Sequence, residues 1–207
     1  MSENIIEQLT AAFIRFPGIG PKQAKRFVYY LLRQDPNQLA KLAEVIKSLR
    51  QEVSQCQYCW RYFTSQNSHS TKKETCPICL DQSRDHTSIM VVEKDVDLDA
   101  VYRTDVYQGI FFVLGGLLPF LEKKPAQKIR LIELKQYLKL KKPKEVIIAL
   151  SANPDGDHTA TYLKKELAET LSAIGAQISF LGRGFSTGTE LEYSDRDTLN
   201  SALKNRS

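Results

Sequence analysis

The stretch Cys56-Gln57-Tyr58-Cys59, followed after sixteen residues by Cys76-Pro77-Ile78-Cys79, decides how the rest of this sequence is interpreted. It contains all four cysteines of the 207-residue chain. Two Cys-x-x-Cys pairs at this separation can place four thiolates around one Zn²⁺ ion at about 2.3 Å, which leaves no coordination position for a substrate. The spacing therefore predicts one structural zinc ion per chain, held by Cys56, Cys59, Cys76 and Cys79.

Two disulfides, or four free thiols, are the alternatives for these cysteines. Residues 1–15 form an amphipathic pattern with Glu3 and Glu7, unlike an export signal, and cysteine is absent elsewhere, as expected in a reducing compartment. No run of about 18 apolar residues is present, so no membrane span is expected. His69 lies between the pairs, but four thiolates already complete a tetrahedral site. These features favour zinc and predict a cytoplasmic protein.

The charged residues are unevenly distributed along the chain. The net charge is +5, with +3 in residues 1–54, +6 in residues 121–145 and −4 in the remainder. Localised positive charge favours a polyanionic partner such as nucleic acid, although basic surfaces often only keep a protein in solution. The apolar fraction of 42% is sufficient for a folded core.

Residues 1–54 are predicted to form three helices. Apolar residues recur at helical spacing, Pro21 is suited to the first turn of the second helix, and Asp35-Pro36-Asn37 precedes the third. The residues expected to be buried are Ile5, Ile6, Leu9, Ala12, Phe13 and Phe16 in the first helix, Ala24, Phe27, Val28, Leu31 and Leu32 in the second, and Leu39, Leu42, Ala43, Ile46, Leu49 and Val53 in the third.

The turn between the first two helices places two glycines beside three cations. Gly18 and Gly20 let the backbone approach a ligand closely, and Lys22, Lys25 and Arg26 follow on the polar face of the next helix. Backbone N–H groups and cations together can hold a phosphate without reading a base. The arrangement resembles the helix-hairpin-helix motif, so these five residues are expected to contact nucleic acid. An ordinary tight turn between packed helices is the alternative.

After the cysteines the pattern changes to short apolar runs separated by helical segments. The runs 89–92, 110–114, 146–150 and 178–181 predict a four-stranded, mainly parallel sheet. Crossover helices are expected to cover it. One of them has its apolar stripe at Ala160, Leu163, Leu167, Leu171 and Ile174.

Acidic residues follow two of these runs. Glu93 follows the first run, and Asp155 and Asp157 follow the third. Because functional groups gather beyond the carboxyl ends of parallel strands, these three carboxylates are candidates for holding Mg²⁺. The alternative is structural: Asp-Gly is a common turn, and Asp157 is placed to cap a helix that starts near Thr159. The sequence leaves magnesium binding open.

Taken in order, the motifs along nearly the whole chain resemble those of one known family. These motifs are the Pro17-Gly18-Ile19-Gly20-Pro21-Lys22 hairpin, the four cysteines, Val91-Val92-Glu93, Phe112-Val113-Leu114-Gly115-Gly116, Asn153-Pro154 before the paired acids, and Gly188-Thr189-Glu190-Leu191-Glu192-Tyr193. In this order they resemble the bacterial RecR family of recombination mediators, whose central part is a Toprim domain.

The resemblance implies a non-enzymatic DNA-repair factor. Such a protein works with RecF and RecO to load RecA at single-stranded gaps and single-stranded/double-stranded junctions, and its subunits form a dimer or tetramer that closes as a ring-shaped clamp. By the same resemblance Lys22 and Arg26 are the hairpin cations nearest DNA. Glu93, Asp155 and Asp157 become Toprim acids that engage partners and DNA rather than supporting an established reaction.

The expected fold is therefore α+β and built from several parts. They are a helix-hairpin-helix region at residues 1–54, a four-cysteine zinc finger at 55–80, a Toprim domain at 87–186 and a C-terminal tail at 187–207 with a role in oligomerisation. Two other functions compete with the repair mediator. One is a Mg²⁺-dependent Toprim enzyme that acts on DNA phosphodiesters, and the other is a zinc-ribbon accessory protein of transcription or translation.

Overall fold

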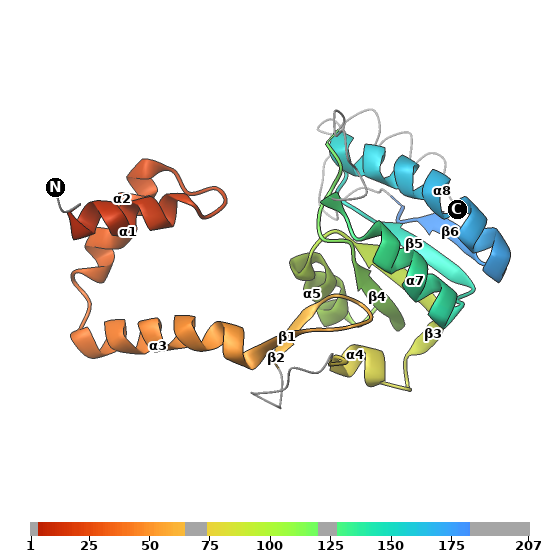
Figure 1. Cartoon of the computed structure of the whole chain (residues 1–207), viewed down its shortest axis with the longest axis horizontal. Helices are drawn as coiled ribbons and strands as arrows, with labels where there is room; N and C mark the ends of the chain where they lie inside the picture. Colours follow the sequence, from red (N-terminus) through yellow and green to blue (C-terminus); the bar gives the residue numbers. More distant parts are fainter. Residues whose placement is uncertain (1–3, 65–73, 120–127, 183–207) are drawn as a thin grey trace, which may run out of the picture. The chain divides into compact units, whose positions relative to one another are not determined.

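The computed structural model describes residues 4–64, 74–119 and 128–182, and it divides the chain into two compact units (Figure 1). The first unit comprises the described residues up to Val53, and the second begins at Ser54. The four cysteines belong to the second unit, together with the central sheet. Among the described helices, none is long and apolar enough to cross a membrane.

The first unit consists of the three helices expected from the sequence: α1 (Ile5–Ile14), α2 (Pro21–Leu31) and α3 (Pro36–Glu52). Their starts follow from local chemistry. The Asn4 side chain accepts a hydrogen bond from the Ile6 N–H (3.1 Å), and the Asp35 side chain accepts one from the Asn37 N–H (2.8 Å). Pro21 occupies the first turn of α2, where its missing N–H has no cost.

The core of this unit is smaller than the apolar pattern suggests. Ala24 and Val28 of α2 are fully buried, and Phe27 packs edge-on against Phe13 of α1, with ring centroids 5.8 Å apart. The prediction that α3 buries an apolar stripe is wrong for the described chain, because four of its residues are exposed: Leu42, Ala43, Ile46 and Leu49. Other residues that were expected to be buried are exposed as well, namely Ile5, Leu9, Ala12, Phe16 and Leu32. Periodicity shows which face of a helix is apolar, but not whether anything within the same chain covers it.

The second unit is built on the predicted four-stranded parallel sheet. Its strands are β3 (Asp85–Val92), β4 (Gly109–Val113), β5 (Glu145–Ala149) and β6 (Gln177–Phe180), in the order β4-β3-β5-β6. All three pairings are parallel, and Val92 lies opposite both Val113 and Ala149. The carboxyl ends of β3, β4 and β5 therefore meet at one edge of the sheet, as the sequence predicted.

Helices cover one face of this sheet, and the cysteine segment together with a helix covers the other. Ile89 and Val91 pack with α7 (Leu131–Lys141) and α8 (Pro154–Ile174), while Met90 and Val92 pack with the cysteines and with Leu98 of α5 (Asp95–Thr104). This alternation follows from the two-residue period of a strand. In Figure 1, α7 and α8 lie on one side of the sheet and α5 lies on the other.

The cysteine segment forms a small knuckle of its own. Strands β1 (Val53–Gln55) and β2 (Tyr62–Thr64) make a two-stranded sheet, and the short helix α4 (Pro77–Leu80) follows. Cys56 and Cys59 lie in the connection between β1 and β2, and Cys76 and Cys79 lie at the start and within α4. The knuckle thus brings two chain segments together at the four thiols.

Candidate metal centre and nucleic-acid surface

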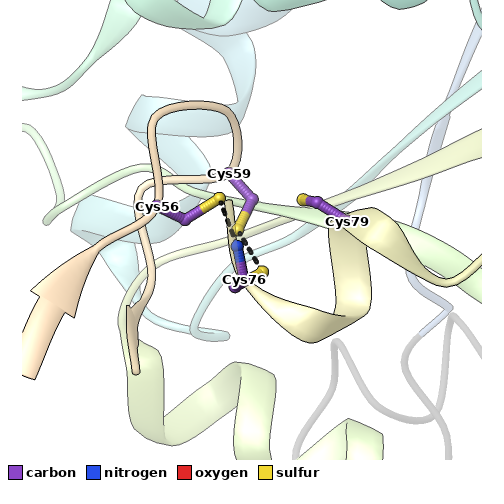
Figure 2. A group of neighbouring side chains, drawn as sticks. All are labelled: Cys56, Cys59, Cys76 and Cys79. Atoms are coloured by element: carbon purple, nitrogen blue, oxygen red, sulfur yellow. Dashed lines mark hydrogen bonds between the residues drawn. The ribbon is translucent and has the colours of Figure 1, made fainter. Parts of the chain in front are cut away.

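The four cysteine side chains point toward a common centre inside the knuckle (Figure 2). All four are buried, the most exposed being Cys79 at 6%, and none forms a disulfide. Their sulfur atoms all lie within 4.8 Å of one another, and the Sγ atoms of Cys59 and Cys76 are 3.5 Å apart. Four sulfurs at 2.3 Å from a tetrahedral zinc ion are about 3.8 Å apart. The arrangement therefore matches a closed zinc site.

Groups around the cysteines support such a site. The Cys76 N–H donates to the Sγ of Cys56 (3.4 Å), and the hydroxyl of Tyr137 on α7 lies 3.9 Å from the Sγ of Cys79. Burial raises the pKa of Tyr137 well above its usual value, so this hydroxyl stays protonated and can donate to a thiolate. Donors of this kind orient metal ligands and neutralise part of their charge. The Tyr137 contact was not foreseen from the sequence, since Tyr137 is 58 residues from Cys79.

The donor set indicates which metal fits. Thiolates are soft ligands that suit zinc, copper(I) and iron, and two Cys-x-x-Cys pairs that close a four-sulfur site are typical of structural zinc; a calcium or magnesium site needs oxygen ligands. Within residues 4–64, 74–119 and 128–182, these cysteines are the only group of three or more His, Cys, Asp and Glu side chains close enough to share an ion. The cluster can therefore hold one metal ion, and its composition is consistent with zinc.

Hydrogen bonds join the knuckle to the edge strand of the sheet and to α5. The N–H of Val113 on β4 donates to the Cys59 carbonyl (2.8 Å), and the N–H of Tyr62 on β2 donates to the Asp95 carboxylate at the start of α5 (2.7 Å). Because β4 is an edge strand, the Cys59 bond satisfies a donor that no neighbouring strand reaches. The four-cysteine cluster is thus part of the sheet unit.

Two cations of the basic segment 121–145 contact the knuckle where it meets the sheet. Arg130 donates to the Val113 carbonyl (2.9 Å), and its guanidinium lies 5.3 Å from the centre of the Trp60 ring. Lys141 lies 5.2 Å from the centre of the Tyr58 ring. These cations therefore hold knuckle aromatics against the sheet unit. Charge counting along the sequence did not predict this role, because it does not distinguish structural cations from ligand-binding ones. Residues 121–127 lie outside the described part.

The aromatic residues that follow Cys59 have different surroundings. Phe63 packs against the cluster that contains the cysteines, while Trp60 packs against the opposite core under Arg130. Tyr62 is half exposed and adds little cover. His69, which the sequence offered as a further metal ligand, lies outside the described residues.

Glu93 occupies the predicted position after β3, and its carboxylate already has partners. It is 95% buried, it pairs with the Lys94 ammonium (2.6 Å), and it accepts a hydrogen bond from the Ser151 hydroxyl (2.7 Å). Burial opposes ionisation, but the hydrogen bonds from Lys94 and Ser151 outweigh it and hold the pKa of Glu93 below its usual value. Glu93 is therefore an ionised carboxylate neutralised by its own neighbours.

Asp155 and Asp157 lie in the first turn of α8. The helix begins at Pro154 and is capped by Asn153, whose side chain accepts a hydrogen bond from the Gly156 N–H (2.8 Å). The expectation that Asp157 caps a helix starting near Thr159 is therefore wrong. The helix starts earlier because Asn153-Pro154 combines a good cap with a proline suited to the first helical position, a signal that was present in the sequence.

These three acids do not form a compact oxygen cage in the described chain. They are absent from the groups of three carboxylate, thiol or imidazole ligands that converge within 4.8 Å among the described residues. Asp155 and Asp157 instead add negative charge where the α8 macrodipole is positive, which is favourable without a metal ion. Glu93, Asp155 and Asp157 are therefore not arranged here as the three-carboxylate Mg²⁺ site for which they were candidates.

The hairpin residues lie where the sequence placed them, at the entrance to α2. Gly18 has a φ of +75°, a left-handed conformation that favours glycine, and the Ile19 N–H closes the turn onto the Phe16 carbonyl (3.1 Å). A Cβ atom at Gly20 would meet no heavy atom within 4 Å, so the backbone there faces open space. The side chains of Lys22, Lys25 and Arg26 are exposed beside it.

The start of α2 therefore combines the features of a phosphate site. Gly20 is the N-cap without a side chain, Pro21 follows, and no acidic residue lies in the first turn. The helix dipole and the three cations favour an anion at this point. This geometry can hold a phosphate backbone, and it offers no group that would select a base.

Comparisons with known proteins agree with the helices of the first unit and with the parallel sheet of the second. A family model described as "RecR, helix-hairpin-helix" matches residues 6–50, and one described as "Toprim domain" matches residues 87–181. The chain is 38% identical to recombination protein RecR of Chloroflexus aggregans, over 97% of this chain and 92% of that protein. It is 35% identical to recombination protein RecR of Paenarthrobacter aurescens, over 100% of this chain and 98% of that protein.

Proposed function

Because this chain belongs to the RecR family of recombination proteins, we propose that it is a DNA-binding mediator of recombinational repair that catalyses no reaction itself. The observation that supports DNA binding most directly is the hairpin, where an open glycine backbone, a helix N-terminus and exposed cations meet. Gly18, Gly20, Lys22, Lys25 and Arg26 are the proposed contacts. They grip phosphates, so binding is independent of sequence.

The metal centre has a structural part in this proposal. One zinc ion per chain, bound by the four cysteines, fixes the knuckle on the edge of the sheet through the Cys59 carbonyl and Arg130. The ion has no free coordination position, so no chemistry on DNA passes through it. We expect the protein to act in the cytoplasm.

The partners and the assembly that we propose for this protein are based on its family membership. The protein acts with RecF and RecO to load RecA at single-stranded gaps, and copies of the chain assemble into a dimer or tetramer that closes around DNA as a ring-shaped clamp. The exposed apolar face of α3 supports self-association, since a free helix would not retain such a stripe uncovered. The tail at 187–207, outside the described residues, is proposed to contribute to assembly.

The Toprim acids are proposed to engage partners or DNA rather than to cut it. Phosphodiester cleavage at such a site needs carboxylates that converge on Mg²⁺, whereas Glu93 is paired with Lys94 and Ser151 and the three acids do not converge. Incubation of the protein with supercoiled and single-stranded DNA in Mg²⁺ tests this directly. Cleavage that is lost in Asp155→Asn would establish the enzyme alternative.

The DNA-binding proposal is tested by reversing the hairpin charges. In Lys22→Glu/Arg26→Glu, affinity for duplex DNA should fall at least about tenfold, and the slope of log affinity against log salt should decrease by about 2, since about 0.9 is lost per phosphate contact. Lys41→Glu/Lys165→Glu makes the same change in net charge on α3 and α8 and should have a much smaller effect. Equal effects of the two pairs would contradict a hairpin site.

A further inference from the structure

Beyond the hairpin, α2 continues as an exposed aromatic and cationic face. Tyr29 and Tyr30 are 44% and 56% exposed, and Arg33 follows one residue after the C-cap. At 3.6 residues per turn, positions 22, 26 and 29 fall within about 60° of one another around the helix axis. The buried Ala24 and Val28 lie on the other side. The tyrosines therefore extend the hairpin's cationic stripe instead of contributing to the core.

These side chains surround an open hollow of about 690 Å³. It is lined by Arg26, Phe27, Tyr29, Tyr30 and Arg33, and within the described chain none of the lining residues is acidic. The Phe27 ring is held in place by its edge-on contact with Phe13. The hollow thus combines three aromatic rings with two guanidinium groups, on a helix that is packed against its neighbour.

This combination matches the chemistry of an unpaired nucleic-acid strand. Bases of any sequence stack on exposed aromatic rings, and guanidinium groups bind the phosphates between them or stack on the bases themselves. A duplex cannot use such rings, because its bases are already stacked on each other. Two exposed tyrosines at the end of a phosphate-binding stripe therefore add a preference that the hairpin alone does not provide.

We propose that Tyr29, Tyr30 and Arg33 form a base-stacking site for single-stranded nucleic acid that adjoins the hairpin phosphate site. The proposal rests on the DNA-binding function proposed above and assigns its single-stranded component to one face of α2. A second copy of the chain is a less suitable occupant of the hollow, because a symmetric contact would bring Arg26 and Arg33 toward the same cations of the partner. Tyr30 also borders the apolar groove lined by α1, α2 and α3, so self-association is one outcome of the test.

The test measures binding of the full-length protein to labelled oligothymidine and to a blunt duplex of the same length. Tyr29→Leu/Tyr30→Leu keeps apolar bulk but removes the rings, and it should weaken oligothymidine binding by at least about tenfold while duplex binding changes less than about twofold. Phenylalanine at both positions should restore oligothymidine binding. Tyr62→Leu, at a half-exposed tyrosine of the knuckle, is the matched control.

The outcomes separate this site from the hairpin. If the leucine variant binds both ligands like the unchanged protein while Lys22→Glu/Arg26→Glu still weakens duplex binding, the stacking site is refuted and DNA binding stands. If the unchanged protein binds neither ligand, the proposed function itself fails. A leucine variant that loses native mass but keeps its oligothymidine affinity per chain would assign the tyrosines to self-association and overturn the proposal.

Discussion

The knuckle and the hairpin place their functional residues in opposite environments. The four cysteines are buried and are tied to the sheet through Val113 and Arg130, whereas the hairpin cations are exposed beside a glycine backbone that faces open space. We therefore expect the buried residues to determine stability and the exposed residues to determine binding. Substitutions in the two regions should therefore have separable effects.

The largest effect is expected from removing a metal ligand. Cys76→Ser should abolish stoichiometric zinc and destabilise the sheet unit by several kcal/mol, because the cysteines fill the core beneath Met90 and Val92. For a protein of this size that lowers the Tm by about 10 °C or more. Calorimetry and metal analysis of the purified protein measure both quantities. Leu80→Ala, at an exposed position next to Cys79, is the control; if Cys76→Ser had no greater effect, the cysteines would not be structural.

A smaller loss is expected where the knuckle meets the sheet. Arg130→Ala removes the hydrogen bond to the Val113 carbonyl and the contact with the Trp60 ring, which should cost about 2 kcal/mol in the free energy of unfolding. Chemical denaturation measures this, with zinc content expected to stay at one ion per chain. Lys139→Ala, at an exposed position on α7, should change the free energy by less than about 0.5 kcal/mol. Loss of zinc in Arg130→Ala would show that the junction and the metal site are one cooperative element.

The hairpin should show the reverse pattern. A Cβ atom fits at Gly20 without a contact, so Gly20→Ala should cost less than about 1 kcal/mol of stability, mainly through the N-cap preference. In the proposed site the added methyl group would stand where a phosphate approaches the backbone, so duplex affinity should fall several-fold. Fluorescence anisotropy and thermal unfolding on the same sample separate the two effects. Unchanged affinity would mean that DNA does not approach this backbone.

The smallest effect concerns the ion pair at the end of β3. Because the pKa of Glu93 is depressed, its contribution to stability is present at neutral pH and is lost as the pH falls through the depressed value, below the unfolded value of about 4.3. Lys94 is mostly exposed, so Lys94→Met should reduce stability by less than about 1 kcal/mol at pH 7 and by less still at pH 3. Denaturation at both pH values measures this. Lys22→Met should leave stability unchanged at either pH, and a larger loss at pH 3 than at pH 7 for Lys94→Met would contradict the assignment.

The sequence predicted those parts of the molecule that depend on local pattern. The four strand runs, the parallel sheet, the helices of the hairpin and the cysteine cluster follow from short-range periodicity and spacing, and the structure and the family models confirm them. The placement of Glu93 after β3 followed in the same way. These features need no knowledge of which segments meet in space.

The features that were missed depend on distant partners. Tyr137 beside Cys79, Arg130 over Trp60 and Ser151 against Glu93 join segments 58 to 70 residues apart, and no spacing rule connects them. The apolar stripe of α3 was expected to be buried because periodicity cannot identify a missing partner. The cap of α8 was the one error that local chemistry should have prevented, since Asn153-Pro154 is a recognisable helix start.

Amide hydrogen exchange before and after zinc is removed with a chelator tests the contrast between the two regions most directly. The Val113 N–H is bonded to the Cys59 carbonyl in the knuckle, and the Ala24 N–H is bonded to the Gly20 carbonyl in the hairpin unit. We predict that metal removal accelerates exchange at Val113 and its neighbours in β4 and leaves exchange at Ala24 unchanged. Equal acceleration at both amides, or none at Val113, would contradict it.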